Sequence, residues 1–222
     1  MVCSSKPLVM LRQSDYIEGK GPNPKKVTIL LEELGVPYKA IEIVNPKDES
    51  FTKINPNGRL PAIEDPNTGL TLWESGAILE YLVEKYDTKH KLSFDTEPER
   101  WYLKQYLHFQ MSGQGPYYGQ AFWFHFVHPE DVPSAKERYD EQVTRVIEVL
   151  DKILESKDYL VGNKFTYADV AFIPWNTAVP IMGNIWRKSD IENKYKNYMA
   201  WHQRLLARPA VAKILTPPLE EK

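Results

Sequence analysis

Leu60–Leu79, with the sequence LPAIEDPNTGLTLWESGAIL, is the stretch that decides the fold. Two short runs that favour strands, Pro61–Glu64 and Leu70–Trp73, flank the turn sequence Pro66–Gly69, and this pattern predicts a β-hairpin. Apolar residues then recur with helical spacing, which predicts a helix that begins at Glu74-Ser75; they are Ile78, Leu79, Leu82, Val83 and Tyr86. The stretch therefore predicts a strand, a turn, a strand and a helix in direct succession.

The residues before this stretch add a strand, a helix and a second strand. The apolar run Pro7–Leu11 and the alternating run Tyr38–Val44 are both expected to be strands. Between them, Asn23-Pro24 predicts a helix start, because Asn is a favoured N-cap and Pro is favoured at the first helical position. Gly35 should end that helix. The order β-α-β-β-β-α is that of a thioredoxin-like α/β domain, which we expect over residues 5–88.

The chain beyond a polar linker, Asp87–Pro98, shows no convincing strands. Thr96–Glu99 and Thr166–Asp169 each have the form of a capping box at a helix start. Pro133-Ser134 opens another amphipathic helix. We therefore expect an all-α domain over residues 95–218.

The composition excludes several classes of protein. The chain has 222 residues, of which 42% are hydrophobic, as in a globular protein of one or two domains. With 28 basic and 30 acidic side chains the net charge is −2, which gives no electrostatic reason to bind nucleic acid or an anionic membrane. No apolar run approaches the ~18 residues of a membrane span, and none suits a signal peptide. Cys3 is the single cysteine, which excludes an internal disulfide and a thiolate metal cluster, so we expect a cytoplasmic protein without a metal.

Two local patterns allow both a structural and a functional interpretation. Leu60-Pro61 precedes a strand and is a candidate for a cis bond, which would present the Leu60 backbone to a ligand; an ordinary trans proline is the alternative. Glu74-Ser75 places a carboxylate beside a helix N-terminus, an arrangement that suits the ammonium and carboxylate of an amino-acid head group. A simple helix cap is the alternative there.

Two further patterns are equally open. Asn23 is expected to cap its helix, and its amide at a helix N-terminus also suits a thiolate that lies above the helix. Ser112–Phe126, with the sequence SGQGPYYGQAFWFHF, contains glycines and a proline that would loosen a helix. Its aromatic side chains either line an apolar pocket or belong to the core.

Taken together, the order and spacing of these patterns resemble the glutathione transferase superfamily over residues 6–215. Leu60–Ala62 and Glu74–Leu79 look like its two glutathione-site motifs, and Thr166–Asp169 looks like its helix-capping box. Within the superfamily the chain is most similar to the fungal class related to the yeast nitrogen-catabolite regulator and to the bacterial Nu class. The strings that carry this similarity are Pro22-Asn23, Asn55–Arg59, Gly119–Ala121, Glu137–Tyr139 and Ala171–Trp175.

The resemblance implies a role for each residue of a glutathione site. Asn23 would contact the glutathione sulfur, Leu60 beside Pro61 would pair with the backbone of its cysteine, and Glu74 and Ser75 would hold the γ-glutamyl head. The remaining ligand-binding residues that the resemblance implies are basic: Lys47 near the glycyl carboxylate, Arg59 next to Leu60, and Arg138 in a segment that can reach the other subunit's site.

Ser14 and Tyr16 are alternatives to Asn23, because other transferase classes activate the thiol with Ser or Tyr. Cys3 precedes the first strand and is expected to take no part.

The function that the resemblance implies is glutathione transfer, with glutathione as co-substrate and a homodimer as the assembly. The thiolate would attack a small apolar electrophile or a glutathionyl disulfide, so disulfide reductase and peroxidase activities remain open, as do detoxifying and biosynthetic roles. The alternative is a non-catalytic glutathione-binding regulatory or interaction protein of the same fold. The yeast regulator carries an Asn-rich extension before its first strand, whereas this chain begins six residues before Pro7, which favours the enzyme.

Overall fold

The structure is a computed structural model that describes residues 8–13, 21–183 and 185–216, the first of these ranges by its backbone. The chain forms two compact units, one of residues up to His90 together with those from Pro209 onward, and one of Lys91–Arg208. Cys3, Ser14 and Tyr16 lie outside the described residues. In the described part of the chain, no helix is both long enough and apolar enough to cross a membrane.

The first unit is built on a sheet with the strand order β2-β1-β3-β4. Its strands are β1 (Leu8–Gln13), β2 (Tyr38–Ile43), β3 (Ala62–Asp65) and β4 (Leu70–Trp73). β1 pairs parallel with β2 and antiparallel with β3, and β3 pairs antiparallel with β4. The hairpin predicted from Leu60–Leu79 is therefore present, and Ala62 lies opposite Trp73 in its register.

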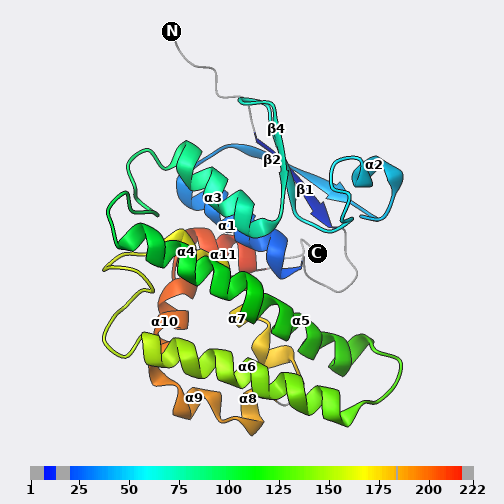
Figure 1. Cartoon of the computed structure of the whole chain (residues 1–222), viewed down its shortest axis with the longest axis vertical. Helices are drawn as coiled ribbons and strands as arrows, with labels where there is room; N and C mark the ends of the chain where they lie inside the picture. The colour runs from blue at the N-terminus through cyan, green and yellow to red at the C-terminus, as the bar shows by residue number, and fades with distance from the viewer. Residues whose placement is uncertain (1–7, 14–20, 184, 217–222) are drawn as a thin grey trace, which may run out of the picture. The chain divides into compact units, whose positions relative to one another are not determined.

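The helices of this unit are α1 (Pro22–Leu34), α2 (Glu49–Thr52), α3 (Ser75–Tyr86) and α11 (Pro209–Leu215). Figure 1 shows α1 and α3 side by side, with α2 on the opposite side of the sheet. The predicted apolar stripe of α1 is buried, and Gly35 ends the helix at φ 65°, a left-handed conformation that favours glycine. The start of α1 differs from the prediction: Gly21 is the N-cap, so Asn23 lies inside the first turn and does not cap the helix.

A small apolar cluster on the α2 side fixes the strand ends that lead to the site. Phe51 of α2 and Ala62 of β3 are its buried members. The partly buried side chains that pack against them include Leu60 and Trp73, together with Ile41, Ile43 and Ile54. Leu60 and Trp73 directly precede Pro61 and Glu74, so packing of this cluster positions the two segments that carry the expected glutathione contacts.

The second unit is helical, as the sequence predicts. Its main helices are α4 (Glu99–Phe109), α5 (Gly115–Phe122), α6 (Pro133–Ile153), α7 (Tyr167–Asn176) and α10 (Lys196–Leu206), with the shorter η3 (Val179–Ile181), α8 (Ile185–Lys188) and α9 (Ile191–Lys194). Two π-helical segments, η1 (Gln110–Gln114) and η2 (Trp123–Val127), flank α5. Both segments overlap Ser112–Phe126, where the sequence predicts a loosened helix. α6 runs beside α5, as Figure 1 shows.

The two predicted capping boxes have different outcomes. At the start of α7, Thr166 and Asp169 form the complete reciprocal box. The box predicted at Thr96–Glu99 is absent, because α4 begins only at Glu99 and its N-cap is Pro98, which has no side-chain cap. Thr96 instead donates its hydroxyl to the Glu99 carboxylate at 3.0 Å.

Candidate functional site

The N-terminus of α3 carries the residues expected to hold an amino-acid head group. Glu74 is its N-cap, with φ 73° and ψ 114° and no side-chain cap hydrogen bond. A positive φ is strained for a residue other than glycine, and such strain occurs preferentially at functional sites. The Glu74 side chain is exposed, whereas Ser75 is buried. The backbone thus presents a carboxylate to solvent directly beside a helix N-terminus, which attracts anions.

Lys26 of α1 lies beneath this terminus and was missed by the sequence analysis. Its side chain is 1% exposed, and its Nζ donates to the Ser75 Oγ at 3.4 Å. Burial lowers the pKa of Lys26 to about 7, against the opposing effect of the Glu74 charge. One signal was present in the sequence, because Lys26 lies four residues before Leu30 and so falls on the apolar stripe of α1.

α3 is held against the hairpin at its other end by a buried carboxylate. Tyr81 and Tyr86 each donate a hydroxyl to Asp65 at 2.5 Å. Burial raises the pKa of the Asp65 carboxyl, but hydrogen bonds from the two tyrosines and from Asn67 together bring it below its ordinary value. These hydrogen bonds fix the orientation of α3 on the sheet. They thereby also help to position its N-terminus at Glu74 and Ser75.

The loop that leads into β3 has the form that the resemblance implies. The Leu60–Pro61 bond is cis. Asn55, which is 1% exposed, donates its side-chain amide to the Arg59 carbonyl at 2.5 Å and accepts from the Asn57 N–H at 3.0 Å. Gly58 has φ 59°, and a Cβ there would lie 2.9 Å from the Pro46 carbonyl oxygen. The hydrogen bonds of the buried Asn55 therefore hold the conformation of the loop, and this conformation requires a glycine at position 58.

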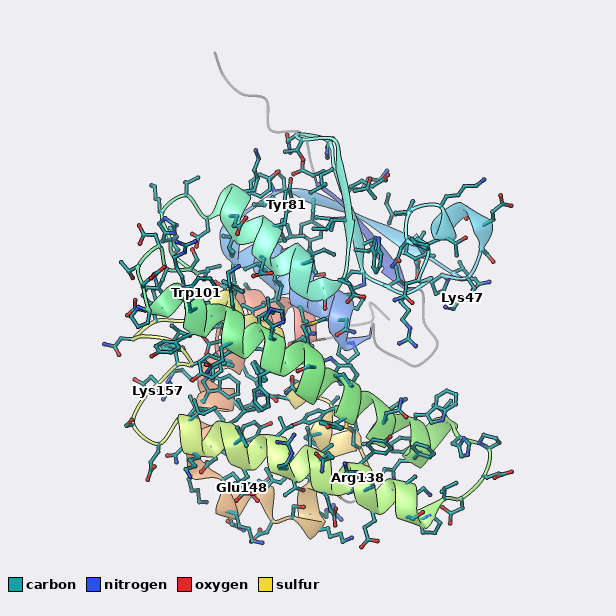
Figure 2. All side chains as sticks on the ribbon, in the orientation of Figure 1. Lys47, Tyr81, Trp101, Arg138, Glu148 and Lys157 are labelled. Atoms are coloured by element: carbon teal, nitrogen blue, oxygen red, sulfur yellow. The ribbon has the colours of Figure 1, made fainter. Side chains whose placement is uncertain are left out.

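The two basic residues of this region, Lys47 and Arg59, are both exposed. Lys47 donates its ammonium to the Asn57 carbonyl at 3.1 Å, which holds it against the same loop. Figure 2 labels Lys47 in the first unit and Arg138 on α6 of the second. Arg138 is also exposed. Asn23 is partly buried in the first turn of α1, one helical turn before Lys26.

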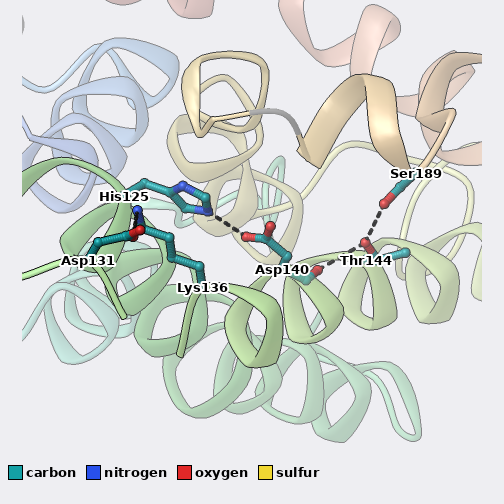
Figure 3. A network of polar contacts seen from close by, with 6 residues as sticks. All are labelled: His125, Asp131, Lys136, Asp140, Thr144 and Ser189. Atoms are coloured by element: carbon teal, nitrogen blue, oxygen red, sulfur yellow. Dashed lines mark hydrogen bonds and ion pairs between the residues drawn. The ribbon is translucent and has the colours of Figure 1, made fainter. Parts of the chain in front are cut away.

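A second polar cluster lies within the other unit and is shown in Figure 3. His125 Nε2 lies 2.8 Å from an Asp140 carboxylate oxygen, and the Thr144 hydroxyl lies 2.9 Å from that of Ser189. A Cβ at Gly183 would lie 2.9 Å from His125 Nδ1, so the ring packs closely on this glycine. The pairs tie η2 to α6 and α6 to the end of α8, and among the described residues no hydroxyl is bonded to His125. We regard this cluster as structural.

A metal site has no candidate among residues 8–13, 21–183 and 185–216, where no group of at least three His, Cys, Asp or Glu side chains could hold an ion. The first unit offers a helix N-terminus at α3, the exposed Glu74 carboxylate beside it and the loop before β3.

Comparison with known families agrees with this geometry. Residues 21–85 match the family described as "Glutathione S-transferase, N-terminal domain", and residues 116–209 match "Glutathione S-transferase, C-terminal domain". The chain belongs to the glutathione S-transferase family. This result confirms the predicted architecture of a thioredoxin-like domain followed by a helical one.

The curated relatives of this transferase-family chain have different names. It is 49% identical over 208 residues to "Glutathione S-transferase-like protein gedE" of Aspergillus terreus, a match that covers 88% of this chain and 91% of the relative. It is 34% identical over 234 residues to "Transcriptional regulator URE2" of Saccharomyces cerevisiae, where 87% of this chain matches 65% of the relative. The family therefore includes relatives named for transfer and a relative named for regulation.

Solved structures of similar proteins contain glutathione compounds. The glutathione transferase URE2P6 of Phanerochaete chrysosporium, in complex with oxidised glutathione, is 44% identical with a TM-score of 0.85, and the match covers 94% of each chain. Ure2p5 of the same organism, cocrystallised with 1-(S-glutathionyl)-2,4-dinitrobenzene, is 41% identical with a TM-score of 0.85, and covers 95% of this chain and 93% of the other.

Proposed function

We propose that this protein is a glutathione transferase that binds glutathione on the first unit and uses its thiolate as a nucleophile. The observation that carries the proposal is the arrangement at the start of α3. The exposed Glu74 carboxylate suits the ammonium of a γ-glutamyl head, and Ser75 with the helix N-terminus suits its carboxylate. Both charges of an amino-acid head group thus find a complementary partner within two adjacent residues.

The remaining contacts follow the chain from this head group. The Leu60 backbone, beside Pro61, pairs with the cysteine of glutathione, and Lys47 and Arg59 serve the glycyl carboxylate end. Lys47 is already held at the loop before β3 by the Asn57 carbonyl, which supports its place at this end of the ligand.

Asn23 is the proposed thiol-activating residue. A cysteine-like thiol has a pKa of about 8.5, so only ~3% is thiolate at pH 7, and a pKa lower by about two units gives roughly three-quarters thiolate. Asn23 lies in the first turn of α1, where an amide donor and the helix dipole both stabilise an anion. The thiolate then attacks an electrophilic carbon, or a sulfur of a glutathionyl disulfide. The relatives crystallised with a dinitrobenzene conjugate and with oxidised glutathione support both substrate classes.

Binding is tested with the double variant Glu74→Ala with Ser75→Ala. Glutathione at a hundredfold excess over its dissociation constant should stabilise the wild-type fold by about 2.7 kcal/mol, and the double variant should lose this stabilisation together with conjugation of 1-chloro-2,4-dinitrobenzene. Lys85→Ala, at the exposed end of α3, is the matched control and should behave as wild type. Equal thermal shifts in the wild type and the double variant would remove the head-group assignment.

Activation is tested with Asn23→Asp. Because Asn23 does not cap α1 and an acidic residue is favourable in the first turn, this variant should fold as stably as the wild type. Its carboxylate beside the sulfur should raise the thiol pKa and shift the pH profile of turnover upward. A wild-type profile in the folded variant would reject Asn23 and direct attention to Ser14 and Tyr16.

A regulatory protein without turnover is the second candidate function, and the 34% identity to a transcriptional regulator is the observation that favours it. Such a protein would bind glutathione with the same residues and leave it unchanged. Turnover with a panel of electrophiles and glutathionyl disulfides separates the two, because a regulator would bind glutathione tightly and convert none of the panel.

We also propose a cytoplasmic homodimer. Trp101 and Tyr102 of α4 are 60% and 47% exposed, which is unusual for large aromatic side chains and supports a partner surface on this helix. In such a dimer Arg138 would reach the site of the other subunit. Sedimentation at micromolar concentration should give the dimer mass, and a monomer mass would reject the proposal.

A further inference from the structure

Asn55 is a buried amide at the start of the loop that leads into β3. The residue is 1% exposed. Its Oδ1 accepts from the Asn57 N–H at 3.0 Å, and its Nδ2 donates to the Arg59 carbonyl at 2.5 Å. These two partners fix the orientation of the amide, because the N–H of Asn57 requires an acceptor and the carbonyl of Arg59 requires a donor.

The backbone of Asn55 is anchored at both of its polar groups. Its N–H donates to the Phe51 carbonyl at 2.9 Å, and its carbonyl accepts from the Gly58 N–H at 2.9 Å. Phe51 and Ala62 of β3 are the buried members of the apolar cluster on the α2 side. The amide of Asn55 is therefore held in place relative to β3, because its backbone is bonded to a residue that packs against this strand.

The hydrogen bond from Asn55 determines which way the peptide group between Arg59 and Leu60 faces. The Arg59–Leu60 peptide bond is trans. In a trans peptide group the carbonyl and the N–H point in opposite directions. Because the Arg59 carbonyl faces the buried amide of Asn55, the Leu60 N–H points away from that amide.

A peptide group that is held on one side is oriented to donate on the other. Leu60 lies in the segment proposed to meet the cysteine of glutathione, and the carbonyl of that cysteine is a hydrogen-bond acceptor. Without a partner for the Arg59 carbonyl, rotation of this peptide group would turn a second acceptor toward the ligand. A donor that is oriented before the ligand arrives removes the entropic cost of ordering it on binding.

We propose that Asn55 is a positioning residue for glutathione: its amide holds the Arg59 carbonyl and thereby directs the Leu60 N–H toward the cysteinyl carbonyl of the ligand. The inference rests on the proposed function, because it names glutathione as the ligand. It concerns the middle of the tripeptide, whereas Glu74 and Ser75 are proposed to bind the γ-glutamyl head. A neutral hydrogen bond of this kind should contribute about fivefold to the affinity.

The test compares two ligands that share the γ-glutamyl head and differ in one carboxamide group. S-methyl-γ-glutamylcysteinamide has the cysteinyl carbonyl, and S-methyl-γ-glutamylcysteamine lacks it. Neither ligand has the glycine that Lys47 and Arg59 are proposed to serve, and neither has a thiol. Calorimetric titration measures both dissociation constants, and the wild type should bind the cysteinamide about fivefold more tightly than the cysteamine.

Two variants assign this preference to Asn55. Asn55→Ala removes both side-chain hydrogen bonds, whereas Asn55→Asp keeps an acceptor for the Asn57 N–H and places a carboxylate oxygen opposite the Arg59 carbonyl. Both variants should bind the two ligands with affinities that agree within about twofold. Asn45→Ala is the matched control, because the exposed Asn45 likewise accepts from the N–H two residues later, that of Lys47, at 3.0 Å. It should keep the fivefold preference.

A change in the preference between the ligands separates positioning from a general loss of stability, since a less stable fold would weaken both ligands equally. A folded Asn55 variant that keeps the fivefold preference would overturn the inference and leave the proposed function intact. Equal binding of the two ligands by the wild type would do the same. A wild type that binds neither these ligands nor glutathione would overturn both.

Hydrogen exchange of the Leu60 amide provides a measurement that needs no substitution, and it applies even where the variants fail to fold. Nuclear magnetic resonance follows this exchange in the wild type. The cysteinamide ligand should slow the exchange of the Leu60 amide several-fold more than the cysteamine ligand does, because only the first offers the N–H an acceptor. Equal exchange rates in the two complexes would overturn the inference.

Discussion

The N-termini of α3 and α7 begin with similar polar residues and serve different purposes. At α7, Asp169 accepts hydrogen bonds from the Leu160 N–H, from the Thr166 N–H and hydroxyl, and from the Trp201 indole, all at 2.9–3.0 Å. At α3, the N-cap Glu74 makes no side-chain cap and is held in a strained conformation. The first terminus satisfies its donors with the protein's own carboxylate, whereas the second has the form of a site for a carboxylate from outside.

The buried groups behind the two termini differ in the same way. Burial raises the pKa of the Asp169 carboxyl, although its hydrogen bonds oppose the shift. Its donors come from several segments of one unit, so the group stabilises the fold. Lys26 is buried behind the N-terminus of α3, with its Nζ 3.4 Å from the Ser75 Oγ. The contacts of Asp169 thus stabilise one unit, whereas Lys26 contacts a residue that is proposed to bind the head group of glutathione.

The largest expected effect is on the α7 terminus. Asp169→Ala should reduce the free energy of unfolding by about 3–5 kcal/mol, because it leaves several buried donors without an acceptor. Denaturation in urea measures the loss, and Asp169→Asn, which keeps one acceptor oxygen, should lose less. Glutathione affinity of the folded fraction should not change. A loss below about 1 kcal/mol would contradict the structural role given to this terminus.

A smaller effect is expected on the stability of the protein in acid, through His202 of α10. His202 follows Trp201, whose indole donates to Asp169. His202 is 6% exposed, and its Nδ1 has no hydrogen-bond partner among the described residues. Burial lowers its pKa from 6.5 to about 4, so the unfolded chain binds more protons between these values. Stability should therefore fall as the pH drops from about 6.5 to about 4, by up to about 3 kcal/mol from this group.

The variant His202→Phe should reduce that decline, because a ring that stacks on Tyr198 is kept and the titrating nitrogens are removed. Urea denaturation at several pH values measures it, with the exposed His108 changed to Gln as the matched control. If the wild type and His202→Phe lose stability in parallel, acid destabilises the protein through other groups.

The smallest expected effect is on the α3 terminus. Glu74→Gly should relieve the positive φ and raise stability by about 1 kcal/mol, while it removes the carboxylate and weakens glutathione binding. Glu74→Ala removes the same carboxylate and keeps the strain, so it should weaken binding without the gain in stability. Melting temperature and glutathione affinity measure the two effects. Equal melting temperatures in the two variants would show that position 74 stores no strain.

The elements around the proposed site were predictable to different degrees. The hairpin and the start of α3 follow from local patterns, since the turn Pro66–Gly69 and the spacing after Ser75 act over a few residues. The start of α1 was predicted two residues late, because Asn and Pro suit several positions of a first turn and Gly21 is the N-cap. Thr96–Glu99 and Thr166–Asp169 share a motif, and only the second is a capping box, because α4 begins after Thr96.

The sequence by itself determined the elements, the two kinds of unit and the residues of the proposed head-group site, because helical and strand periodicity, caps and turns are local properties. The tertiary structure decided that Lys26 lies under Ser75, that Asn55 holds the loop before Pro61, and that α11 packs with the first unit. Each of these depends on contacts between residues far apart in the chain. The protonation state of Lys26 depends on them as well, because desolvation and the Glu74 charge arise only when α1 and α3 pack together.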